Sequence, residues 1–147
     1  MTADYQPVYL PGDAVTATAS AQVTHGDLVE VSGSGTVAPV PVTPGAVPSL
    51  KVVGLASLDT AVNARVTYYA RATVHESVAL GTVTAGDQVG SAIAGDVPGG
   101  VRTIAPPALG GSPAGADINT ELSHARAVLG VALTTATYPA KCRWMSY

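Results

Sequence analysis

The chain has 147 residues, a net charge of −3 and only 12% charged residues, below the roughly 25% of ordinary soluble proteins. Its seven lysines and arginines are scattered, which argues against a nucleic-acid-binding face, and no apolar run approaches the roughly 20 residues of a membrane helix. Cys142 is the single cysteine, which excludes an intrachain disulfide, and the N-terminus does not resemble a secretory signal; we therefore expect synthesis in a reducing cytoplasm.

The first 14 residues predict an extended N-terminal arm, followed by one compact β domain over residues 15–147. The arm carries four large apolar side chains among prolines, a pattern too irregular for a helix and too apolar for a free tail. Two interpretations stay open: an edge strand packed on its own domain, or an arm that lies on a partner and adds a strand to its sheet. In the second case the candidate contacts with a partner or a neighbouring subunit are Tyr5, Val8, Tyr9 and Leu10.

Short strands account for most of the remaining chain. Alternation of polar and apolar residues over Ala64–Val74 predicts a half-buried strand, and Lys141–Met145 alternates in the same way, with Cys142 and Trp144 on one face. In the 64–74 strand the predicted apolar face holds Val66, Tyr68, Ala70, Ala72 and Val74. Further strands are predicted where apolar runs are bounded by turn residues, at Asp27–Val31, Thr36–Val40, Lys51–Ser57 and Arg126–Thr134.

One short helix is compatible with the pattern near the C-terminus. Asp117 can cap it, and the apolar residues that follow step by four, three and four, which places them on one helical face: Ile118, Leu122, Ala125 and Leu129. The strand predicted from Arg126 competes for the end of this helix. Two segments rich in proline and glycine, Pro41–Ser49 and Pro106–Ala116, predict loops.

The chain repeats one phrase. Val-Thr-x-Gly-Asp-x-Val begins at Val23 and again at Val83, and Val-x-Gly-x-Ala occurs at Val52–Ala56 and at Val128–Ala132. Because Gly-Asp supplies a turn before a strand, we interpret the phrase as a fold element and not as a site. The sequence therefore predicts an all-β fold, a small barrel or sandwich built from two related halves (residues 15–69 and 74–147), with at most one short helix.

Residues that could carry chemistry are sparse. The histidines His25, His75 and His124 are far apart in sequence, and His75-Glu76-Ser77 cannot converge as a triad because adjacent strand residues point to opposite faces. We interpret His75, Glu76 and Ser77 as surface polar residues. One cysteine, scattered histidines and isolated acidic residues offer no metal cluster, and phosphate-loop and nucleophile-elbow motifs are absent. We expect no catalytic residue, no metal and no cofactor, and hence no enzyme.

The order of these elements resembles a known family. The stretches Tyr9–Pro39, Lys51–Thr60, Arg65–Tyr69, Gly81–Val89 and Ala125–Ala136 together resemble the small capsid decoration (cement) proteins of tailed bacteriophages. The resemblance implies an all-β protein that binds the major capsid protein on the outer capsid surface of the virion. It also implies a homotrimer at three-fold and quasi-three-fold axes that stabilises the DNA-filled head. On this interpretation the arm residues contact the capsid or the neighbouring subunit.

Two other functions compete with this interpretation. The first is a glycan-binding or fibre-type module of the virion, but Tyr68 and Tyr69 are predicted on opposite faces of one strand, which does not build a sugar platform. The second is a hydrolase that uses His75 or His25.

Overall fold

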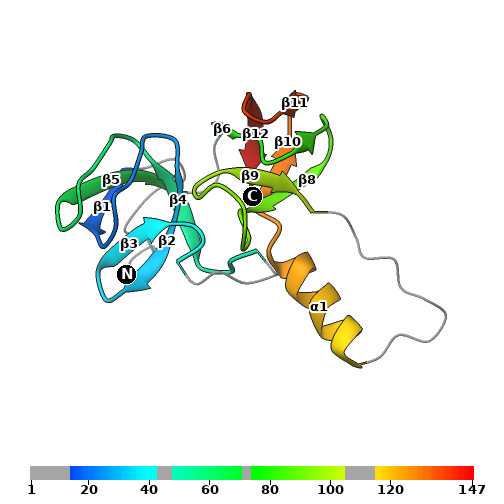
Figure 1. The fold of residues 1–147 in the computed structure, drawn as a ribbon, viewed down its shortest axis with the longest axis horizontal. Coiled ribbons are helices and arrows are strands. Elements are labelled where there is room, and N and C mark those ends of the chain that lie inside the picture. The colour runs from blue at the N-terminus through cyan, green and yellow to red at the C-terminus, as the bar shows by residue number, and fades with distance from the viewer. Residues whose placement is uncertain (1–13, 43–47, 71–73, 105–114) are drawn as a thin grey trace, which may run out of the picture.

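A closed five-stranded barrel forms the first half of the chain. The computed structural model describes residues 14–42, 48–70, 74–104 and 115–147; of Asp117, Thr120, Glu121 and His124 it describes only the backbone. The barrel has the strand order β1-β3-β2-β4-β5 and closes by antiparallel pairing of β5 with β1 and parallel pairing of β1 with β3 (Figure 1). Its strands are β1 (Ala14–Ala19), β2 (Leu28–Gly33), β3 (Thr36–Pro39), β4 (Val52–Ala56) and β5 (Arg65–Ala70).

The second half repeats this arrangement in the order β6-β12-β10-β8-β9. Strands β6, β8, β9, β10 and β12 correspond to β1, β2, β3, β4 and β5, and a parallel bridge joins Ala79, just after β6, to Val101 of β9. A two-stranded sheet, β7 (Thr82–Val83) with β11 (Ala136–Thr137), lies beside it. The bounds of the remaining elements are β6 (Val74–Val78), β8 (Gln88–Ser91), β9 (Val101–Thr103), α1 (Gly115–Arg126), β10 (Gly130–Ala132) and β12 (Lys141–Ser146).

The repeated phrase forms the same turn in both halves. The Asp27 carboxylate accepts a hydrogen bond from the Thr24 amide at 2.8 Å, and the Asp87 carboxylate accepts one from the Thr84 amide at 2.9 Å. The glycine between them adopts a positive φ in each turn, 83° at Gly26 and 96° at Gly86, a conformation that favours glycine. A third turn of this kind, which the repeat did not predict, joins Ile93 to Asp96 through a 2.9 Å bond.

The Val-x-Gly-x-Ala motifs also adopt matching positions. Gly54 in β4 lies opposite Ala70, and Gly130 in β10 lies opposite Ser146. A Cβ atom at either glycine would overlap a carbonyl oxygen of the neighbouring strand, that of Tyr69 or that of Met145. The motif therefore needs glycine because two strands approach each other closely there.

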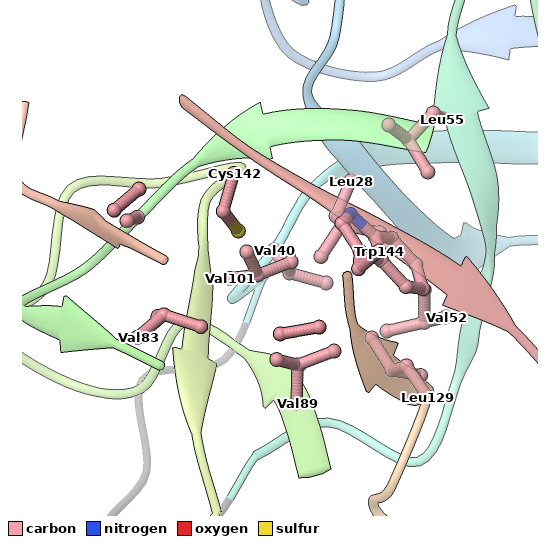
Figure 2. Packing of buried hydrophobic residues seen from close by; sticks show 13 residues of the cluster. Leu28, Val40, Val52, Leu55, Val83, Val89, Val101, Leu129, Cys142 and Trp144 are labelled. Carbon is pink, nitrogen blue, oxygen red and sulfur yellow. The ribbon is translucent and has the colours of Figure 1, made fainter. Parts of the chain in front are cut away.

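Two hydrophobic clusters fill the halves, and their members correspond. The barrel interior contains Ala19, Val23, Val29, Val37, Ala56 and Val66, with Tyr68 packed against them. The matching positions of the second half are Ala79, Val83, Val89, Val101, Ala132, Cys142 and Trp144, all in the other cluster. That cluster also receives four residues from the first half, which Figure 2 shows around Trp144, Val101 and Cys142: Leu28, Val40, Val52 and Leu55. The second half is thus closed by side chains from the first.

The structure confirms the predicted fold class, including two related halves, a small barrel and one short helix. Two details differ. The predicted single strand over residues 64–74 is two strands, β5 and β6, and Ala72 lies outside the described residues. Val74 is exposed because it lies on the outward face of β6, opposite the exposed Met145. The strand expected from Arg126 begins at Gly130, after the helix ends. The division into an arm and a single domain over 15–147 stays a prediction.

Candidate functional site

His25 lies in the first Gly-Asp turn and is hydrogen-bonded to Asp59. Its Nδ1 atom lies 2.9 Å from an Asp59 carboxylate oxygen, and its backbone amide donates to the same oxygen at 2.8 Å. These two hydrogen bonds hold the pKa of Asp59 below its usual value. In the second half the Ala85 amide donates to the Thr135 hydroxyl at the corresponding position, so the turn forms without a histidine. We therefore interpret the contact between His25 and Asp59 as structural.

The prediction that His75, Glu76 and Ser77 are surface polar residues is wrong for two of the three. His75 and Ser77 are buried because their strand pairs with β12, whose Trp144 lies opposite His75. The Trp144 indole donates to the Ser77 hydroxyl at 3.1 Å, and the His75 ring lies 5.1 Å from the Trp144 ring. Burial lowers the pKa of His75. These contacts make a core polar cluster and not a nucleophile with its base.

No set of three or more histidine, cysteine, aspartate or glutamate residues in the described ranges is placed to hold a metal ion. The helix α1 is neither long nor apolar enough to span a membrane. His124 belongs to α1, and its side chain lies outside the described part of the structure.

The arm residues Tyr5, Val8, Tyr9 and Leu10 lie outside the described residues, as do most of the two predicted loops. Their contact with a partner stays a prediction. The described residues next to the first loop are informative: Val42 and Leu50 are exposed, and the Ser49 amide donates to the buried Ser91 hydroxyl of the second half at 3.0 Å. This segment lies at the junction of the two halves.

The helix α1 presents apolar side chains to solvent. Figure 1 shows it extending away from both sheets, and Ile118 and Leu122 are 46% and 49% exposed. Only Leu129, beyond the end of the helix, is buried among the four residues predicted on one face. The predicted helix exists, but of the predicted face only Leu129 packs in the hydrophobic core, whereas Ile118 and Leu122 are exposed.

A hollow lined by β2 and residues 49–51 contains a buried acidic residue, Glu30. Its volume is about 350 Å³, and its walls include Val31, Val42 and Leu50. Glu30 lines it and is only 4% exposed. Glu30 was predicted only as part of a strand; the signal that marks it is a charged residue inside the apolar run Asp27–Val31.

The comparisons with known proteins concern the fold. No family model and no curated protein matches the chain. Among solved structures, the chain is similar to one described as the crystal structure of head fiber gp8.5 N base in bacteriophage phi29, with a TM-score of 0.53 and 17% identity. The similarity covers 92% of this chain and 93% of that one, so both halves take part.

This similarity places the fold beside that of a phage head protein. The likeness is to the base of a head fibre, and the role of a cement protein stays a prediction.

Proposed function

We propose that this protein is a non-enzymatic structural component of a phage virion that attaches to the outer surface of the head. The observation that carries the proposal is the similarity to the phi29 head fiber N base over 92% of this chain and 93% of that one. The more specific role we propose is that of a cement protein, which binds the major capsid protein and stabilises the DNA-filled head.

Exposed apolar side chains support a protein that is largely covered by neighbours. Specific interfaces lose charged residues at their centres, and this surface combines few charges with exposed valines, leucines and tyrosines. The larger exposed apolar residues include Val31, Leu50, Leu58, Tyr69, Val97, Ile118, Leu122, Tyr138, Met145 and Tyr147.

We propose a homotrimer at three-fold and quasi-three-fold positions, because three equal contacts made at once convert modest affinities into strong attachment. A clamp that binds the assembled shell but not its separated subunits stabilises the shell by mass action. In this proposal the arm residues Tyr5, Val8, Tyr9 and Leu10 contact the capsid or the neighbouring subunit.

The direct test mixes the purified protein with undecorated, expanded heads of its phage and images the particles. We expect density at the three-fold positions and a higher temperature of DNA release, with light scattering giving the mass of a trimer in solution. A variant that lacks residues 1–10 should keep its circular dichroism spectrum and lose attachment. Heads that remain bare with the full chain would contradict the proposed function.

A second candidate is the base of a head fibre, which the phi29 similarity favours directly. Images of the virion separate the two roles, because a base carries an extended shaft and a cement protein leaves a low knob on the shell. A glycan array tests the associated possibility of sugar binding. Alanine variants of His25 and His75 should attach like the wild type if no chemistry is involved.

A further inference from the structure

Glu30 is a buried carboxylate with half of its hydrogen-bonding capacity unused. Its Oε1 atom accepts a 2.6 Å hydrogen bond from the Val42 amide, whereas its buried Oε2 atom has no partner among the residues that the structure describes. Burying a carboxylate is costly unless both oxygens are compensated. A group that donates to Oε2 would therefore gain more here than on the open surface.

The strand geometry explains why Glu30 is buried. Glu30 in β2 lies between Ala38 of β3 and Val52 of β4, on the face that Leu28 also occupies, outside the barrel interior. The register of β2 and β4 shifts between Val29 and Glu30, a bulge of the kind that redirects side chains near functional sites.

The hollow above Glu30 has apolar walls and a single acidic group. Val31 and Val42 are 43% and 41% exposed and Leu50 is 58% exposed, so these side chains are available to a partner. A second hollow of about 420 Å³ continues from it and shares Val31, Leu50 and Lys51. Volumes of this size hold a long side chain with room to spare.

We propose that this hollow binds an arginine side chain of a partner protein, with the guanidinium donating to Glu30 and the methylenes packed on Val31, Val42 and Leu50. An arginine combines an apolar stem with several N–H donors in a planar head, which matches apolar walls around one carboxylate. The identity of the partner rests on the proposed function: it is the major capsid protein, and Glu30 would form a charge-complementary contact with it.

Lys51 is the nearby cation of the chain itself, and it does not already occupy the site. It lines the hollow, yet the ion pairs among the described residues do not include one between Lys51 and Glu30. Its side chain is exposed. Lys51→Gln should therefore tighten binding of a cation, because it removes like-charge repulsion; weaker binding in Lys51→Gln would overturn this part of the inference.

The test titrates N-butylguanidinium into labelled protein and follows amide shifts by NMR. We expect saturable shifts at Val31, Val42 and Leu50 in the millimolar range, at least a tenfold weaker response in Glu30→Gln, and a much weaker response to the neutral isostere N-butylurea. Glu30→Gln keeps an acceptor for the Val42 amide, and Leu50→Ala, which alters only an exposed wall, provides a second weakened variant if Glu30→Gln fails to fold. Absent shifts, or equal binding of both probes, would overturn the site.

The link to the capsid is tested separately. Glu30→Gln protein should need at least tenfold more protein to cover heads, while Lys141→Gln, a charge-removing substitution at an exposed residue outside the lining of the hollow, should cover them like the wild type. If N-butylguanidinium binds but Glu30→Gln still attaches normally, the capsid as partner is overturned and the proposed function stands. If wild-type protein leaves heads bare, the proposed function fails, and the NMR result alone decides the site.

Discussion

Tyr68 and Trp144 occupy equivalent positions in the two halves of the chain. Each lies directly opposite the alanine that ends a Val-x-Gly-x-Ala motif, Ala56 for Tyr68 and Ala132 for Trp144. Tyr68 is half-buried at the barrel interior, whereas Trp144 is fully buried in the cluster that both halves share. Trp144, the larger of the two, therefore lies in the cluster through which side chains of the first half close the second half.

We expect Trp144→Ala to lower the free energy of unfolding by about 3–5 kcal/mol, the usual cost of removing a buried Trp or Phe. Tyr68→Ala should cost clearly less, because its side chain is only partly buried. Urea unfolding of the two variants measures the difference. Equal losses would mean that Trp144 does not anchor the shared cluster.

Alanine at Gly54 or Gly130 should destabilise the protein by about 3 kcal/mol or more, since the new Cβ would overlap a strand carbonyl that cannot move freely. Gly115→Ala is the matched control: nothing lies near its Cβ position at the start of α1, and we expect a change within about 0.5 kcal/mol. Thermal unfolding distinguishes the three variants. Tolerance of alanine at Gly54 would refute the close strand approach.

Leu122 and Leu129 were predicted on one face of the helix, and the structure separates them. We expect Leu129→Ala to cost about 2–5 kcal/mol, because Leu129 is buried, and Leu122→Ala to stay within about 0.5 kcal/mol, because Leu122 is exposed. Denaturant midpoints measure both. A large loss at Leu122 would show that α1 packs on the domain.

The buried His75 should make stability depend on pH. Its pKa in the folded state lies below the usual value of about 6.5, so between the two values the unfolded chain binds more protons and stability rises with pH. We expect the unfolding temperature to fall from pH 7.5 to 5.5, and to fall less in His75→Gln. His25→Gln, at an exposed histidine, should retain the wild-type decrease in unfolding temperature. If His25→Gln loses this decrease and His75→Gln keeps it, the pH dependence does not come from His75.

Cys142 should be unreactive in the folded protein. Its side chain is buried in the shared cluster, and burial raises the pKa of its thiol, which disfavours the reactive thiolate. We expect negligible labelling by a thiol reagent at pH 8 in buffer and complete labelling in urea. Rapid labelling of the native protein would indicate that the second half opens readily.

Local patterns were sufficient for much of this fold. The two Gly-Asp turns depend on residues three positions apart, and the alternation in Lys141–Met145 depends on neighbours, so both could be predicted from the sequence. The short helix also followed from local spacing. These features need no knowledge of which strands pair.

Contacts between distant strands could not be predicted in the same way. The burial of His75 and Ser77 depends on pairing with β12, which lies at the other end of the second half in the sequence. The parallel pairing of β1 with β3, which closes the barrel, has no local signal either. Glu30 lies at a register shift between β2 and β4 and accepts a hydrogen bond from the distant Val42 amide, so only its charge within an apolar run marked the hollow.

The two halves meet through unlike faces, and this has a consequence for assembly. The outside of the first unit, including Leu28 and Leu55, covers the interior of the second, a head-to-tail contact that in principle can be repeated without end. In the second unit the position of Leu28 is taken by Gln88, which is exposed and pairs with Val131 as Leu28 pairs with Leu55. Because Gln88 stands where this contact uses a leucine, the outer face of the second unit is less suited to cover a further unit in the same way.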